Sequence, residues 1–236
     1  MEEGHALAFL HIFQIPAKFS FSRMDYDSLL TLFFNGSENV YLDGFAMLAT
    51  KAWIWIGLYI TILYVVFRTH DMRRFLGILF GILLCVLIAD QVSSGIVKPI
   101  VARYRPTHSP EIMHLTDVVC GYRGGMYGFF SSHASNTMAI ATFLSLVFRK
   151  KNITFTLLAW SLLNCWTRLY LGVHYCSDIL VGILFGCLTG SVIYFLYHIF
   201  VAKRIRQQYT TEEVSPIATA FLLTLIVLAV PWRLYL

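Results

Sequence analysis

Long apolar runs constrain the fold of this chain more than any other feature. Of its 236 residues, 58% are hydrophobic and 13% are charged, whereas a soluble domain carries about 25% charged residues. Several of the runs approach the roughly 20 residues that an α-helix needs to cross a bilayer. The sequence therefore predicts an all-α integral membrane bundle, and its length suits a single domain.

Six apolar segments are expected to span the membrane. They cover residues 48–67, 75–97, 134–148, 153–170, 179–201 and 217–235. Lys98-Pro99 is expected to end the second span, because a residue that precedes proline is disfavoured in a helix. Gly182, Gly186 and Gly190 recur every four residues in the fifth span, and this spacing predicts close packing against another helix.

The spans divide the chain into two parts. Residues 48–236 are predicted to form a six-helix membrane domain, and residues 1–47 an amino-terminal interfacial or extension segment. Within that segment, residues 1–27 leave two interpretations open, an interfacial helix or an extension upstream of an alternative start at Met24. The chain begins with Met-Glu-Glu, whereas a signal peptide begins with a basic region, so no signal peptide is expected.

Three short basic turns alternate with the loops that carry the other polar residues. They lie at residues 68–74, 149–151 and 203–206, and each holds three basic residues. The positive-inside rule places such turns in the cytoplasm. The remaining polar loops are then expected on the outer face, which is periplasmic in a bacterium and lumenal in a eukaryotic endomembrane.

The net charge of +5 is interpreted as a reflection of this topology and of anionic lipid headgroups. Nucleic acid is not expected as a partner, because no binding motif for it occurs. Cys120 and Cys176 lie in two polar loops, and both a disulfide and two free thiols stay open there. The sequence gives no indication of the oligomeric state.

Three polar clusters stand out within the apolar second half of the chain. They cover residues 98–106, 130–133 and 167–178. Arg105 and Arg168 carry permanent charge and forked donors that match phosphate oxygens, and Lys98 adds a point charge. Ser131 offers a hydroxyl, and the amides around Ser132 would attract an anion if they open a helix. These groups predict a phosphate site.

Two histidines and a carboxylate would supply the chemistry of this site. His174 and Asp178 are four residues apart, a spacing that places both on one face of a helix. The carboxylate can hold one imidazole nitrogen and raise the basicity of the other, so that His174 acts as a nucleophile. His133 is then free to protonate the leaving oxygen. No metal or other cofactor is expected, because the cations neutralise the charge that a metal would otherwise meet.

The three clusters resemble the signature of the type 2 phosphatidic acid phosphatase (PAP2) superfamily. That signature is Lys-x6-Arg-Pro, then Pro-Ser-Gly-His, then Ser-Arg-x5-His-x3-Asp. The matching residues, with the required gaps, are Lys98, Arg105 and Pro106, then Ser131 and His133, then Arg168, His174 and Asp178. The resemblance covers roughly residues 53–199 and implies a PAP2-type helical core.

The resemblance also implies residue roles. It implies that Lys98, Arg105, Ser131 and Arg168 hold the phosphate, that His174 is the nucleophile oriented by Asp178, and that His133 is the general acid. Phe130, Ser132 and Thr167 stand where the family has proline, glycine and serine. Ser132 bears on how closely the backbone approaches the phosphate, although its hydroxyl could serve as an additional donor. None of the three changes removes a charge or a proton carrier, so an active enzyme is expected.

The loop at residues 101–130 is expected to cover the site and shape its entrance. Arg123 within it is a candidate for a headgroup contact, and the alternative is a solvated loop charge. A membrane site favours a lipid phosphate or pyrophosphate as substrate. By the resemblance, undecaprenyl pyrophosphate and lipid A phosphate are favoured over phosphatidylglycerophosphate and phosphatidic acid.

Three other classes of function are compared with this one. A lipid-to-lipid phosphotransferase would use the same residues and differs only in the acceptor. A vanadate-dependent haloperoxidase also shares them, but those relatives are soluble. A non-enzymatic lipid carrier would account for the spans and leave the three-part site unexplained. The sequence therefore favours a hydrolase of the bacterial inner membrane with a periplasmic site.

Overall fold

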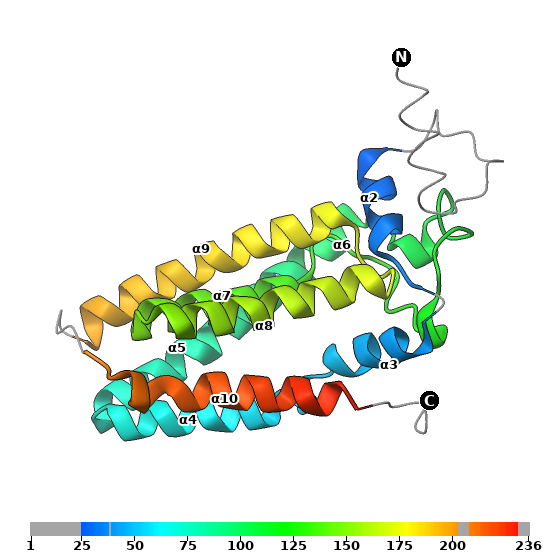
Figure 1. The fold of residues 1–236 in the computed structure, drawn as a ribbon. Helices are drawn as coiled ribbons and strands as arrows, with labels where there is room; N and C mark the ends of the chain where they lie inside the picture. The colour runs from blue at the N-terminus through cyan, green and yellow to red at the C-terminus, as the bar shows by residue number, and fades with distance from the viewer. Residues whose placement is uncertain (1–24, 38, 203–207, 231–236) are drawn as a thin grey trace, which may run out of the picture.

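The computed structural model describes residues 25–37, 39–202 and 208–230. These residues form helices and loops, and their only strand-like pairing is an isolated bridge between Tyr104 and Tyr127. Figure 1 shows long helices side by side in one bundle, with α2 standing across one end of it. The predicted all-α fold is confirmed. Most of the segment 1–27 lies outside the described residues.

The α-helices are α2 (Tyr26–Phe34), α3 (Val40–Ala49), α4 (Ile56–Thr69), α5 (Met72–Asp90), α6 (Lys98–Val101), α7 (Ser132–Phe148), α8 (Lys151–Tyr170), α9 (Cys176–Phe200) and α10 (Thr211–Leu228). Short 3₁₀ segments are η2 (Ala52–Trp55), η4 (Pro106–His108) and η5 (Val119–Gly121), and η3 (Gln91–Val97) is a π-helical segment.

Four helical stretches among the described residues are long and apolar enough to cross a membrane. They are Ala52–Thr69, Met72–Val101, Cys176–Phe200 and Thr211–Leu228. Helices α7 and α8 are not among them: α7 has 17 residues, and α8 buries polar residues such as Asn164 and Arg168. The predicted count of six spans therefore stays a prediction.

The second span ends later than predicted. The helix widens at η3, where the amide of Lys98 donates to the carbonyl of Ser93, and α6 then continues through Pro99 to Val101. It stops at Ala102, which has a left-handed conformation with φ of 48°. Pro99 is tolerated because it lies in the first turn of a new helical segment, where a missing amide costs little. The first span also differs, since residue 48 belongs to α3 and the span begins at Ala52.

Helix α7 lies at the centre of the bundle, where it packs against α5, α8 and α9. The glycines of α9 allow this approach. A methyl group at Gly182 would lie 2.7 Å from the carbonyl oxygen of Ser131, and one at Gly186 would lie 2.6 Å from that of Ser135. A methyl group at Gly190 would meet the carbonyl of Ala139. The predicted close packing along this stripe is confirmed.

Gly186→Ala is expected to lower the midpoint of thermal unfolding in detergent. The added methyl group has no room against the backbone of α7, and overpacking of this kind costs about 1–3 kcal/mol. Gly57→Ala in α4 is the matched control, because a methyl group there meets nothing within 4 Å. Equal midpoints for the two variants would contradict the packing described.

The basic turns at residues 68–74 and 149–151 lie at the end of the bundle opposite to α2 and α6 (Figure 1). There, Arg73 of the α4–α5 turn donates to the carbonyl of Phe200 at 2.8 Å, and Tyr209 contacts His70 at 2.6 Å. The basic cluster at residues 203–206 lies outside the described residues. The described basic turns and the polar clusters therefore occupy opposite ends of the molecule.

Candidate active site

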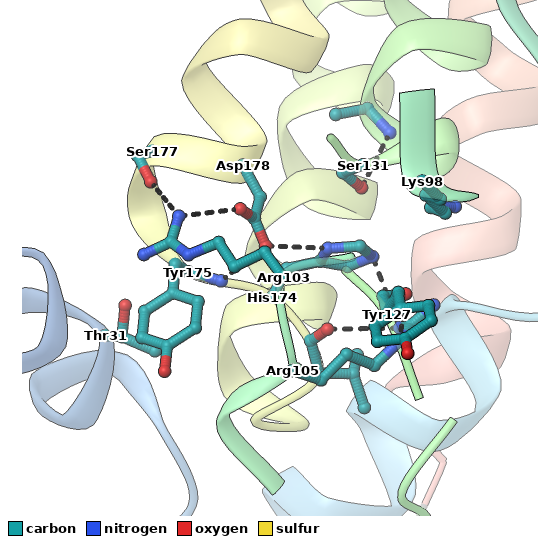
Figure 2. Close-up of polar contacts among 12 residues, drawn as sticks. Thr31, Lys98, Arg103, Arg105, Tyr127, Ser131, His174, Tyr175, Ser177 and Asp178 are labelled. Atoms are coloured by element: carbon teal, nitrogen blue, oxygen red, sulfur yellow. Dashed lines mark hydrogen bonds and ion pairs between the residues drawn. The ribbon is translucent and has the colours of Figure 1, made fainter. Parts of the chain in front are cut away.

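The three polar clusters meet at the end of the bundle that α2 covers (Figure 2). Lys98 comes from the start of α6, and Arg105 from the loop that follows. Ser131, Ser132 and His133 open α7, Arg168 lies in the last turn of α8, and His174 and Asp178 flank the start of α9. Helix ends thus place most of these groups at one level of the fold.

His174 and Asp178 form a buried pair, with 1% and 0% of their side chains exposed. Nδ1 of His174 lies 3.3 Å from Oδ2 of Asp178, and Nη1 of Arg105 lies 3.3 Å from Nε2 of the same ring. A guanidinium can only donate hydrogen bonds, so Nε2 accepts and Nδ1 carries the proton that points at Asp178. The lone pair of Nε2 therefore faces the cationic groups.

Burial lowers the pKa of His174 well below its usual value of 6.5, and the charges of Arg105, Arg168 and Lys98 lower it further. Both causes disfavour the imidazolium form. The ring is consequently neutral at physiological pH, which is the state a nitrogen nucleophile requires.

The two arginines are held in different ways. Arg105 donates to the carbonyls of Tyr127 and Val173, each at 3.1 Å. Burial and, to a smaller extent, the charge of Arg168 lower the pKa of Arg105 to about 10, so its side chain stays charged. Arg168 is 2% exposed and donates to Thr50 at 2.6 Å and to Tyr122 at 3.2 Å. Its Nε is buried without a partner among the described residues, so a donor remains for an anion.

The opening of α7 carries the remaining donors. Nζ of Lys98 donates to Oγ of Ser132 at 3.1 Å. Oγ of Ser131 caps the helix by accepting from the amide of Ala134 at 3.4 Å, which leaves its proton free to donate elsewhere. The amide of Ser131 donates to the carbonyl of Asp178 at 3.1 Å. This hydrogen bond connects the start of α7 to the start of α9. The amino end of α7 lies at the site, and a helix amino end attracts anions.

His133 lies in the first turn of α7 and lines a cavity of about 450 Å³. It is close enough to Lys98, Arg105 and Arg168 for their charges to act on its ring. Arg123 is not brought to this cluster by any contact among the described residues; its Nη1 donates to the carbonyl of Thr107 at 2.9 Å. The structure thus gathers the predicted residues apart from Arg123.

The cavity lies between α4, α5, α7 and α8, and its walls are mostly apolar. His133 and Thr50 lie on its lining, with Ile62, Leu79 and Ile140 among the apolar residues. Two further lining residues carry unpaired buried polar atoms, Oδ1 of Asn136 and Nε1 of Trp160. The cavity therefore joins the polar cluster to the apolar interior of the bundle.

Several polar residues at the site were missed by sequence reasoning. They are Asp27, Thr50, Arg103, Tyr122 and Ser177. Arg103 lies inside the first cluster, two residues before Arg105, and this position was a usable signal. Asp27 was not detectable, because it is 150 positions away from its partner Ser177. All five cysteines, among them Cys120 and Cys176, are free thiols.

Gly128→Ala is expected to lower kcat at least tenfold. A methyl group at Gly128 would lie 2.9 Å from Oδ2 of Asp178 and 3.5 Å from Nδ1 of His174, so the pair would have to shift, and small misplacements near reacting groups cost about 100-fold. Gly125→Ala in the same loop is the control, because a methyl group there meets nothing within 4 Å. Phosphate release by the two variants gives their kcat values, and equal values would contradict the close approach of Gly128 to His174 and Asp178.

Comparison with known proteins identifies the family of this chain. The PAP2 superfamily model matches residues 74–203. Lipid A 4'-phosphatase of Porphyromonas gingivalis is 40% identical over 168 residues, which are 71% of each chain. Lipid A 4'-phosphatase of Bacteroides thetaiotaomicron is 37% identical over 181 residues, 76% of this chain and 80% of the relative. No solved structure matches. The chain belongs to the PAP2 superfamily and is a membrane lipid phosphatase.

Proposed function

We propose that the protein hydrolyses a phosphate monoester of lipid A through a covalent phosphohistidine on His174. The observation that carries the mechanism is the arrangement around that ring: Nδ1 faces Asp178 at 3.3 Å and Nε2 faces Arg105 at 3.3 Å. The names of the two relatives support lipid A as the substrate.

The reaction has two displacements. Nε2 of His174 attacks phosphorus while the bond to the lipid oxygen breaks, and His133 gives that oxygen a proton. Water, deprotonated by His133, then attacks the phosphohistidine, and inorganic phosphate leaves. Arg105, Arg168 and Lys98 balance the charge on the phosphoryl oxygens, the task that metal ions perform at other phosphoryl-transfer sites.

The cavity beside His133 is assigned to an acyl chain of the lipid. Its apolar walls suit a hydrocarbon tail, and its size, about 450 Å³, suits part of one. Oδ1 of Asn136 and Nε1 of Trp160 are unpaired there, and they can bond an amide, ester or hydroxyl group near the head of an acyl chain. An undecaprenyl tail has no such group, so this observation favours an acylated lipid over undecaprenyl pyrophosphate.

The proposed location is the bacterial inner membrane with the site on the periplasmic face. The basic turns at the opposite end of the bundle support this orientation through the positive-inside rule. Cys120 is exposed and lies two residues before Tyr122, which accepts from Arg168 of the site, so a membrane-impermeant maleimide is expected to label it from outside in spheroplasts. Labelling of Cys120 only after permeabilisation would reverse the orientation.

Phosphate release by the detergent-purified protein tests the function. Lipid A, undecaprenyl pyrophosphate and phosphatidic acid are compared, with a chelator present throughout. We expect turnover without added metal, inhibition by vanadate and the highest kcat/KM for lipid A. A higher kcat/KM for undecaprenyl pyrophosphate would contradict the assignment of lipid A as the substrate. Transfer of the phosphate to a second lipid in place of water would identify a phosphotransferase, and loss of turnover with chelator would contradict the mechanism.

The lowered pKa of His174 predicts a specific pH dependence. Because the neutral ring is the nucleophile and its pKa lies well below 6.5 in the free enzyme, protonation of His174 should not lower kcat/KM until the pH falls below 6.5. The pH profile of kcat/KM reports groups of the free enzyme. The ionisation of the substrate, measured separately by phosphorus NMR, is divided out. A decline that begins above pH 6.5 after this correction would contradict the neutral ring.

A further inference from the structure

Asp178 has a second partner on the side away from His174. Its Oδ2 faces the imidazole and accepts from the amide of Tyr175 at 3.1 Å, while its Oδ1 accepts from Nη1 of Arg103 at 3.0 Å. Figure 2 shows the carboxylate between the two side chains. Because Asp178 is 0% exposed, a paired cation is what allows a carboxylate to remain ionised at such a position.

Arg103 is itself fixed on three sides. Its Nη2 pairs with Oδ2 of Asp27 at 2.8 Å, its Nη1 also donates to Oγ of Ser177 at 2.7 Å, and its guanidinium lies 3.9 Å above the ring of Tyr175. Burial opposes its charge, but the hydrogen bond to Asp27 and the charges of Asp178 and Asp27 raise its pKa. The guanidinium therefore has one orientation and a permanent charge.

Asp27 brings the helix α2 into this network. Its Oδ1 accepts from the amide of Ser177 at 2.9 Å, and the hydroxyl of Ser177 donates to its Oδ2. Burial opposes ionisation of Asp27, but the hydrogen bonds from Ser177 and Arg103 lower its pKa overall. A helix from the amino-terminal part of the chain thus supplies the carboxylate that holds Arg103 against the first turn of α9.

We propose that Arg103 is a positioning residue for the reaction, and that Asp27 of α2 holds it there. Arg103 keeps Asp178 charged and fixes its rotation, so that Oδ2 keeps the proton of His174 on Nδ1 and leaves Nε2 free to attack. Arg103 itself does not touch the phosphate. This role rests on the proposed function of His174 as nucleophile.

The test separates kcat from KM in Arg103→Met, Arg103→Lys and Asp27→Asn, each assayed as phosphate release from lipid A. Partners that orient a reacting group contribute about 10- to 100-fold. We therefore expect kcat to fall by this amount in Arg103→Met with KM within about twofold of wild type. Arg103→Lys should recover part of the loss, since it keeps the charge but cannot bridge both carboxylates. Asp27→Asn should lose roughly tenfold.

The coupling between Asp27 and Arg103, measured in a double variant, distinguishes a positioning role from a merely structural one. Because Asp27 acts through Arg103, the double variant Asp27→Asn/Arg103→Met should be no slower than Arg103→Met alone. Arg73→Met is the matched control, since Arg73 binds a backbone carbonyl at the other end of the bundle; it should keep wild-type kcat. If Arg103→Met does not fold, Arg103→Lys and Asp27→Asn carry the test.

Wild-type kcat in Arg103→Met, or in both Arg103→Lys and Asp27→Asn, would overturn the proposal. Losses that multiply in the double variant would overturn the coupling, and a rise in KM with unchanged kcat would place Arg103 in substrate binding. His174→Ala in the same assay distinguishes failure of the role of Arg103 from failure of the proposed function. If that variant is inactive while Arg103→Met is normal, only the role of Arg103 fails; if His174→Ala is active, the proposed function fails.

Discussion

Purified His174→Ala is expected to release phosphate from lipid A at least about 10⁴ times more slowly than wild type. The variant removes Nε2, the atom that would form the bond to phosphorus. The same nitrogen faces Arg105 at 3.3 Å, on the side of the ring away from Asp178. The measurement is kcat under saturating substrate in detergent, with phosphate detected directly.

A second histidine variant, His108→Ala, is the control for the loss of a histidine that has no part in the reaction. His108 lies in the loop near the site and contacts the hydroxyl of Thr107 at 3.2 Å. It has no assigned role, so His108→Ala should keep wild-type kcat. His174 is almost completely buried, and an unfolding curve for each variant therefore accompanies the rates. A folded His174→Ala enzyme with turnover within tenfold of wild type would rule out the nucleophile.

Asp178→Asn is expected to lower kcat by about 10³- to 10⁴-fold. An amide has one oxygen, and because Arg103 can only donate, that oxygen is expected at the Oδ1 position, where it accepts from Arg103. The NH₂ group then takes the Oδ2 position beside His174 and the amide of Tyr175, and it favours the tautomer with the proton on Nε2. His174 would then carry its proton on Nε2, where the lone pair is needed.

Asp71→Asn is the matched control for this change. Asp71 caps α5 by accepting from the amide of Arg74 at 3.0 Å, and its side chain is 58% exposed at the opposite end of the bundle. Asparagine caps helices about as well as aspartate, so Asp71→Asn should behave as wild type. If Asp178→Asn reduced kcat no more than this control, the tautomer argument would be wrong.

The sequence was most informative where the signal is local. Apolar runs predicted the helices, and the fixed gaps among Lys98, Arg105, Arg168 and His174 brought together residues that the structure also gathers. The stripe at Gly182, Gly186 and Gly190 predicted a close helix contact. The helices and the glycine stripe follow from spacing within one segment, which periodicity reports directly, whereas the gathering of the site residues followed from the resemblance to the family signature.

Features that depend on tertiary geometry were not predictable. The π-helical turn at Gln91–Val97 carried the helix past Pro99, although the local rule for proline placed its end at Lys98. Asp27 reached the site through α2, whose docking on α9 follows no sequence spacing. The cavity beside His133 arises where four helices meet, and no one of their sequences encodes it.

Helix α2 and the residues that follow it connect the amino-terminal part of the chain to the site. Residues 1–47 were predicted as an interfacial or extension segment, and that division stays a prediction. Within it, Thr31 accepts from the amide of Cys176 at 3.1 Å, and Asn35 donates to the carbonyl of Tyr170 at 2.9 Å. These contacts join the segment to both ends of the loop that carries His174.

Trapping of the phosphoenzyme tests the central claim most directly. Wild-type protein and His174→Ala are mixed with lipid A labelled with ³²P, quenched with alkali within milliseconds, and digested for mass spectrometry. The account predicts an acid-labile, alkali-stable phosphate on the peptide that contains His174, formed and lost at rates compatible with kcat, and absent from the variant. Label on another residue, or phosphate release at full rate with no labelled protein at any time, would contradict it.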